Sequence, residues 1–221
     1  GKKMDIGIET LIIIILTIII IYLVYITYYN SKLLKVTSTI DNKKYYVQDK
    51  DDSQEAANLI AKIRAKLDIL ITHLNKSYPN DKRTILLNSN YRENSLKEGV
   101  DDPRYTSYSI NKGEQIVLCL RNNDKLMDIN TMMFVVLHEM GHLSSESIGH
   151  TDEFWENFKW ILEESINIGI YIKQEFNKKP IEYCGMSITS SPLDNQFIFD
   201  IKDVDNSENV IEAFFINPLY V

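Results

Sequence analysis

The fold of this chain is decided by one stretch, Phe134-Val-Val-Leu-His138-Glu139-Met-Gly-His142. It places His-Glu-x-x-His inside an apolar run, and the spacing of the apolar residues predicts a helix over residues 130–143. Side chains four positions apart share one face of a helix, so His138 and His142 can reach one metal ion. Glu139 lies about 100° further round the helix, where its carboxylate can face a water molecule on that metal without binding the metal itself.

The chemistry of a catalytic zinc explains this spacing. Zinc lowers the pKa of a bound water towards about 7, and an adjacent carboxylate can then accept the proton. We therefore predict zinc as the cofactor, with no other, and Glu139 as the catalytic base. The chain has four histidines, and three of them (His138, His142 and His150) fall within thirteen residues. The alternative is that the two motif histidines are ordinary helix residues satisfied by hydrogen bonds.

A catalytic zinc needs a third protein ligand. His150, eight residues after His142, is the first candidate, because Gly149 suits a turn back and Thr151-Asp152 opens the next predicted helix. The alternatives are acidic residues on or before that helix: Glu163 and Glu164, as in a thermolysin-like arrangement, and then Glu146 and Asp152.

Peptide-bond hydrolysis also needs a hydrogen-bond donor that stabilises the oxyanion. The candidates are three tyrosines: Tyr105, Tyr108 and Tyr183. An edge strand at residues 115–120 is expected to line the cleft and to offer its backbone to an extended peptide.

The helix predicted over residues 152–172 carries apolar residues at helical spacing, which we interpret as a core-facing side. These residues are Phe154, Trp155, Phe158, Trp160, Ile161 and Ile168. Two acids at its start, Asp152 and Glu153, are candidates for orienting a zinc-binding imidazole, or are simple N-terminal helix acids.

A resemblance to known families rests on His138-Glu-Met-Gly-His142, followed by Gly149-His150-Thr-Asp-Glu-Phe154-Trp155 and Phe158. This pattern resembles the WLM and SprT-type zinc peptidases, small zincin-like domains that combine HExxH with a downstream histidine and a nearby aromatic residue. The resemblance covers about residues 105–175. It implies that His138, His142 and His150 bind zinc and that Glu139 is the general base and acid. The chain also resembles metallopeptidase-like proteins of large DNA viruses.

The segment from Leu11 to Tyr29 holds nineteen residues without a charge. A helix of this length spans roughly 30 Å, about the thickness of a bilayer core. It predicts a single transmembrane helix rather than a soluble core helix, and its length disfavours a cleaved signal peptide. Lysines are more numerous after the span than before it, which favours a soluble domain on the cytoplasmic side.

The chain is thus expected to have four parts: a tail (1–10), a transmembrane helix (11–29), a linker (30–50) and a zincin-like domain (51–221). Within the domain the pattern predicts helices at 53–74, 130–143 and 152–172, a short strand at 84–87, a loop at 88–104, and a hairpin of 105–110 with 115–120. This order predicts an α+β domain in which a small antiparallel sheet packs on the motif helix and the helix after it.

Composition limits the function classes. The 221 residues carry a net charge of −7 without a basic cluster, so no nucleic-acid partner is expected. Two cysteines, Cys119 and Cys184, are too few for a disulfide scaffold. We predict a membrane-anchored zinc metallopeptidase with peptide or protein substrates. The alternatives are a catalytically silent structural or assembly protein, for example a virion component with virion or membrane-protein partners, and a membrane-tethered interaction module without metal.

Overall fold

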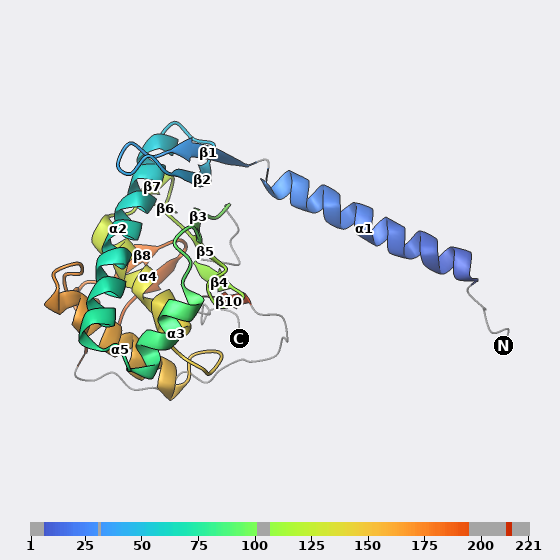
Figure 1. Cartoon of the computed structure of the whole chain (residues 1–221). Helices are drawn as coiled ribbons and strands as arrows, with labels where there is room; N and C mark the ends of the chain where they lie inside the picture. Colours follow the sequence, from blue (N-terminus) through green and yellow to red (C-terminus); the bar gives the residue numbers. More distant parts are fainter. Residues whose placement is uncertain (1–6, 31, 101–106, 195–210, 214–221) are drawn as a thin grey trace.

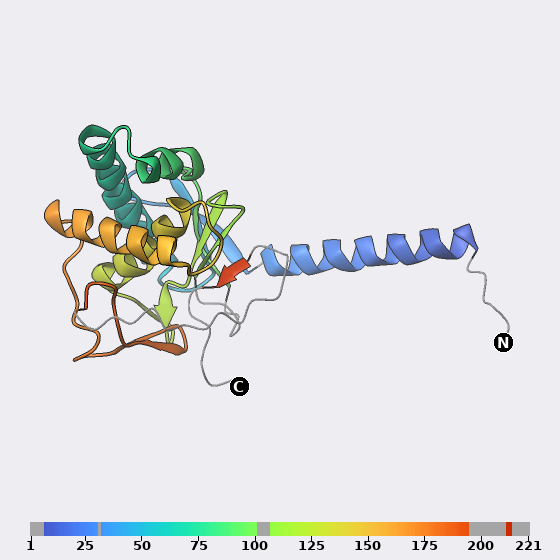
Figure 2. The ribbon, with the colours of Figure 1, turned by 90° about the horizontal axis from the view of Figure 1, so that it is seen from below.

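The computed structural model describes residues 7–30, 32–100, 107–194 and 211–213, and begins with an apolar helix (Figure 1). This helix, α1 (Ile8–Asn30), projects away from the domain in both ribbon views (Figures 1 and 2). From Ile8 to Thr27 it is long and apolar enough to cross a membrane, and none of this segment is buried against the rest of the chain. The position of the helix agrees with the predicted span at 11–29.

A β-hairpin follows α1 directly. Strands β1 (Leu33–Thr37) and β2 (Lys44–Gln48) pair antiparallel, and alternate residues of β2 face the core, where Tyr45 and Val47 are buried. Asn58 Oδ1 accepts hydrogen bonds of 2.9 Å from Ser38 Oγ and Thr39 N, which ties the hairpin to the next helix. The structure therefore includes in the folded domain most of the stretch that the sequence analysis assigned to a linker.

The helices of the domain are α2 (Ser53–Ser77), α3 (Lys82–Asn90), α4 (Ile129–Leu143) and α5 (Asp152–Asn167). The prediction of a strand at 84–87 was wrong, because these residues lie in α3. Asp81 caps that helix by accepting a hydrogen bond of 2.9 Å from Arg83 N, and its buried residues, Thr84 and Leu87, are three positions apart as a helix requires. Helix α5 ends before 172, since Gly169 adopts a φ of +73°.

The main sheet has the strand order β10-β4-β5-β3. Its members are β3 (Leu96–Glu98), β4 (Tyr108–Ile110), β5 (Gln115–Leu118) and β10 (Ile211–Ala213). Strands β4 and β5 form the expected antiparallel hairpin, whereas β3 pairs parallel to β5, so the sheet is mixed. The loop predicted at 88–104 therefore contains a strand. The expectation of an edge strand at 115–120 was also wrong, because β5 is hydrogen-bonded on both sides.

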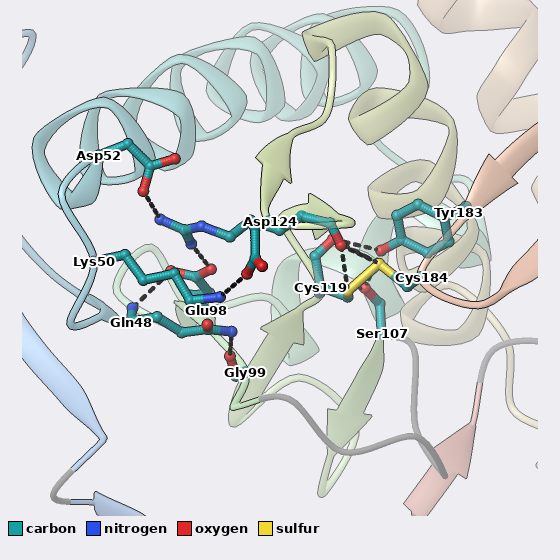
Figure 3. A network of polar contacts seen from close by, with 11 residues as sticks. Gln48, Lys50, Asp52, Glu98, Gly99, Ser107, Cys119, Asp124, Tyr183 and Cys184 are labelled. Carbon is teal, nitrogen blue, oxygen red and sulfur yellow. Dashed lines mark hydrogen bonds and ion pairs between the residues drawn. A yellow bond between two sulfur atoms is a disulfide. The ribbon is translucent and has the colours of Figure 1, made fainter.

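Two short hairpins complete the fold. One pairs β6 (Arg121–Asn122) with β7 (Lys125–Leu126), and the other pairs β8 (Ile181–Tyr183) with β9 (Met186–Ile188). A disulfide between Cys119 and Cys184 joins the residue after β5 to the turn of the β8–β9 hairpin (Figure 3). The two cysteines are 65 positions apart, so the sequence alone did not reveal the bond.

A buried ionic network connects the first hairpin to the rest of the domain (Figure 3). The Arg121 guanidinium pairs with the carboxylates of Glu98 and Asp52, and Glu98 also accepts a hydrogen bond of 2.7 Å from Gln48 N. Glu98 is fully buried and Arg121 is 5% exposed. The network thus joins β2, the start of α2, β3 and β6 through one desolvated cation.

Replacing Arg121 with Met should lower the free energy of unfolding by about 3–5 kcal/mol, because it leaves the buried Glu98 carboxylate without its cation. The measurement is chemical denaturation of the full chain in detergent micelles, followed by the fluorescence of Trp155 and Trp160. Lys62→Met, at an exposed position of α2, is the control and should change the value by less than about 0.5 kcal/mol. Equal stabilities of the two variants would contradict the assigned role of Arg121.

Candidate metal centre

The HExxH motif lies on α4, the central helix of the domain. Every residue from Thr131 to Leu143 is buried, and α4 contacts α2, α3 and α5. A helix that is buried on all sides must be apolar all round, which accounts for the apolar residues between the motif and the helix start. Asp128 caps the helix by accepting a hydrogen bond of 2.9 Å from Thr131 N.

Three imidazoles converge at the end of this helix. The Nε2 atom of His138 lies 3.0 Å from the Nε2 atom of His142 and 3.0 Å from that of His150. The ligand atoms of the three residues all lie within 4.8 Å of one another. A tetrahedral zinc with Zn–N distances of about 2.0–2.1 Å separates its nitrogens by about 3.4 Å. The donor set and its spacing therefore fit a zinc ion.

Most of the site is buried, and this affects the charge of its histidines. His138 and Glu139 are fully buried and His142 is 5% exposed. Burial lowers the pKa of His138 and of His142 well below the ordinary value, and repulsion from the neighbouring imidazoles lowers it further. Both rings are thus neutral near pH 7, which is the form that binds a metal.

Aromatic residues of α5 hold the imidazoles in place. The Phe154 ring stacks on His142 at a centroid distance of 4.1 Å and meets the edge of His138 at 4.6 Å, while Trp155 stacks on His150 at 5.6 Å. The sequence pattern predicts core packing for these aromatic residues, and the structure shows in addition that they contact the histidines. Gly141 permits it, because a Cβ atom there would lie 3.0 Å from both Phe154 Cε2 and Phe158 Cβ.

The loop between α4 and α5 carries His150. Gly149 adopts a φ of +82°, a conformation that side chains rarely take, and Thr151 caps α5 by accepting a hydrogen bond of 3.3 Å from Phe154 N. Glu153, a candidate for orienting an imidazole, instead accepts hydrogen bonds from the backbone N–H groups of Glu146 (3.0 Å) and Ser147 (2.9 Å). Hydrogen bonds from Ser147 and from these backbone amides lower the pKa of Glu153 to about 2.

Two further residues hold this loop, and neither was predicted from the sequence to have a role at the site. Lys112, in the turn between β4 and β5, donates hydrogen bonds from Nζ to the carbonyls of Glu146 (2.8 Å) and Ser145 (3.2 Å). Asn157 of α5 donates from Nδ2 to Ser145 Oγ at 2.9 Å and to the Ser144 carbonyl at 3.1 Å. No local pattern marks these contacts, because each joins segments that are distant in the sequence.

The other candidates for the third ligand lie elsewhere. Glu164 contacts His73 Nε2 at 2.6 Å and accepts a hydrogen bond of 2.9 Å from the Tyr78 hydroxyl. Glu146 directs its carboxylate to Lys82 at 2.6 Å, and both Glu163 and Asp152 are exposed. Of the candidates, the structure brings His150 to the two motif histidines.

The three candidate tyrosines are placed differently. Tyr105 lies outside the described residues, and Tyr108 is partly buried in β4. Tyr183 is buried, donates a hydrogen bond of 2.9 Å to the Cys119 carbonyl and accepts one of 2.5 Å from Ser107 Oγ (Figure 3). Burial raises the pKa of Tyr183, and the negative charge of Glu139 contributes to the rise. Glu139 is thus one of the groups whose charge acts on Tyr183.

The chain is similar to several known proteins. A protein-family model, described as the WLM domain, matches residues 38–212. An uncharacterised protein of Acanthamoeba polyphaga mimivirus is 34% identical over 164 residues, which cover 72% of this chain and 83% of that protein. An uncharacterised protein of Invertebrate iridescent virus 6 is 30% identical over 127 residues, covering 54% and 68%. Among solved structures, Wss1 from Saccharomyces cerevisiae aligns with a TM-score of 0.42 and 22% identity, over 55% of this chain and 85% of that one.

Replacing His150 with Ala should weaken zinc binding by more than about 100-fold, because even the loss of a residue that only supports a ligand weakens binding by about 10–100-fold. Competition with a chelator on the full chain measures the affinity. Glu163→Ala, on the exposed side of α5, is the control and should bind zinc like the unaltered chain. The opposite result, with binding lost in Glu163→Ala and kept in His150→Ala, would reassign the third ligand.

Proposed function

Because this chain belongs to the WLM family, a zincin-type metallopeptidase family, we propose that it is a membrane-anchored zinc metallopeptidase that hydrolyses peptide bonds. The observation that carries the proposal is the convergence of three imidazoles at the end of a buried helix that also carries Glu139. This arrangement combines a metal-binding donor set with a proton acceptor on the same buried helix.

In this proposal His138, His142 and His150 hold the zinc through their Nε2 atoms. The ion, when bound, supplies a Lewis acid that polarises the scissile carbonyl and makes water acidic enough to lose a proton. Glu139 accepts that proton as the oxygen of water forms a bond with the carbonyl carbon. It then delivers the proton to the leaving amine nitrogen as the C–N bond breaks, so that one water is added across the peptide bond.

The candidate oxyanion donors remain Tyr105, Tyr108 and Tyr183. Of the two that the structure describes, Tyr183 is buried and Tyr108 is partly buried. The Tyr183 O–H group donates to the Cys119 carbonyl, so a role in catalysis requires the hydroxyl to turn towards the substrate. We propose peptide or protein substrates, and the net charge of −7 supports the expectation of no nucleic-acid partner.

A second candidate function is a catalytically silent structural or assembly role, for example in a virion with virion or membrane-protein partners. The similarity to proteins of a mimivirus and an iridescent virus favours a viral setting. Retention of Glu139 between the two motif histidines favours catalysis over this role, because a purely structural metal site has no need of a proton acceptor.

The membrane anchor is part of the proposal. Two observations favour opposite sides of the membrane for the domain. The excess of lysines after α1 favours a domain on the cytoplasmic side. The disulfide between Cys119 and Cys184 favours an oxidising compartment, where such bonds persist. Protease digestion of intact membrane vesicles, with and without detergent, distinguishes the two sides.

Replacing Glu139 with Gln should keep zinc bound and lower the rate of peptide hydrolysis by at least about 100-fold, because the proton acceptor is lost while the ligands remain. New N-termini in a mixture of denatured proteins, counted by mass spectrometry, report hydrolysis, and elemental analysis reports zinc. Glu163→Gln is the control and should cleave at the unaltered rate. Cleavage by Glu139→Gln at that rate would refute the assignment, and no cleavage by any zinc-loaded chain would favour the silent role.

Replacing Ile15 and Ile19 of α1 with Lys should prevent stable insertion into membranes. Each lysine near the centre of a spanning helix is unfavourable by about 2.5–3.5 kcal/mol. Flotation of the full chain with phosphatidylcholine vesicles at alkaline pH measures insertion. The control places lysines at two exposed isoleucines of the domain, Ile69 and Ile85, and should float like the unaltered chain. Flotation of the α1 variant would show that this helix is not the anchor.

A further inference from the structure

A cavity of about 900 Å³ lies between the β1–β2 hairpin and β3, and we call it the hairpin cavity. Lys35 comes from β1, Lys43 and Lys44 from the turn and start of β2, and Lys97 from β3. The cavity shares no residue with the metal centre.

The lining of the hairpin cavity is basic. Four lysines line it and no aspartate or glutamate does, although the whole chain has a net charge of −7. Lys43 pairs with Glu93, and Lys35 lies over the ring of Tyr46 at 5.3 Å from its centroid. Within the part of the chain that the structure describes, neither Lys44 nor Lys97 has an ion pair. The cavity therefore keeps two uncompensated positive charges.

Lys97 is the more informative of these two lysines. Its side chain is partly buried, and burial lowers the pKa of its ammonium group. The lysine is thus partly removed from water without a carboxylate to compensate the loss. A phosphate group in the cavity would supply that compensation, because its oxygens accept hydrogen bonds from an ammonium group and carry the opposite charge.

The position of the cavity, close to the end of α1, favours a phosphate group that belongs to a membrane lipid. Helix α1 ends at Asn30 and β1 begins at Leu33, so three residue steps of at most about 3.5 Å each separate the hairpin from the end of the helix. The headgroup layer on each side of a bilayer is about 5–8 Å thick. If α1 spans a membrane, the start of the hairpin lies within or just beyond the headgroup layer. Its exposed Leu34 and Tyr46 suit this interface, which favours apolar and amphipathic side chains.

We propose that the hairpin cavity binds the phosphate-bearing headgroup of an anionic lipid in the membrane that α1 enters. This inference rests on the membrane-anchor part of the proposed function and is independent of catalysis. Lys44 and Lys97 contact the phosphate, and Lys35 and Lys43 contribute to the positive potential around it. Binding fixes the hairpin, and with it the domain, in one orientation on the membrane surface.

The test uses the full chain in nonionic micelles, titrated calorimetrically with dihexanoyl phosphatidylserine, dihexanoyl phosphatidylcholine and inorganic phosphate in turn. We expect saturable binding of the phosphatidylserine and at least about tenfold weaker binding of the other two. Lys44→Gln with Lys97→Gln should weaken binding about 30-fold, at about fivefold per lysine. Lys44→Arg with Lys97→Arg should retain it, and so should Lys62→Gln with Lys159→Gln at exposed sites on α2 and α5.

Three results would overturn the proposal. Equal affinity of the glutamine pair and the unaltered chain would remove the two lysines from the site. Equal affinity for inorganic phosphate would assign the cavity to a soluble anion rather than a lipid. Tighter binding of a polyglutamate peptide than of phosphatidylserine would assign it to an acidic polypeptide. A chain that does not float with vesicles refutes the anchor and the lipid site together, whereas a chain that floats but binds no phosphatidylserine refutes the lipid site alone.

Discussion

The metal centre depends on how closely α5 packs against α4 at Gly141. Two of the converging imidazoles come from α4, and the third arrives on the loop that leads into α5, so the spacing of the two helices sets the spacing of the nitrogens. A Cβ atom at position 141 would require Phe154 and Phe158 to shift by a few tenths of an ångström. The absence of a side chain at Gly141 therefore allows the aromatic residues of α5 to pack closely against the helix that carries His138 and His142.

The loop that carries His150 shows how the fold holds a ligand outside regular structure. Its backbone carbonyls are bound by Lys112 and Asn157, and its N–H groups by Glu153. These three residues come from a turn of the sheet and from α5, so the loop takes its shape from both of its neighbours. Buried or half-buried backbone groups need such partners, and satisfying them leaves the loop few other conformations. The imidazole thus approaches the motif histidines from a fixed direction.

The sequence predicted the parts of this site that are set by local geometry. The positions of His138 and His142 follow from the helical repeat, and Gly149-His150-Thr151 was identified as a return turn and helix start from residue types alone. The sheet was predicted less well. Strand β3 pairs with β5, which comes later in the sequence, and the residues around β3 are polar enough to suggest a loop. The strand expected at 84–87 failed for a related reason, since the apolar pair Leu86-Leu87 suits either structure and the capping bond of Asp81 decides between them. Tyr183 could be identified as a candidate oxyanion donor, but its position could not be predicted, because its neighbours come from segments far apart in the sequence.

The disulfide between Cys119 and Cys184 has a consequence for a protein that is proposed to cut polypeptides. All of the histidines of the metal centre lie between these two cysteines, so the bond closes a covalent ring around the whole site. In the chain-entropy account a ring of 65 residues is worth about 4 kcal/mol to the folded state. A single nick inside the ring, for instance by self-cleavage in the exposed part of the α4–α5 loop, would leave two fragments that stay joined until the bond is reduced. Damage to the chain would then not release the half that carries the membrane helix from the half that carries α5.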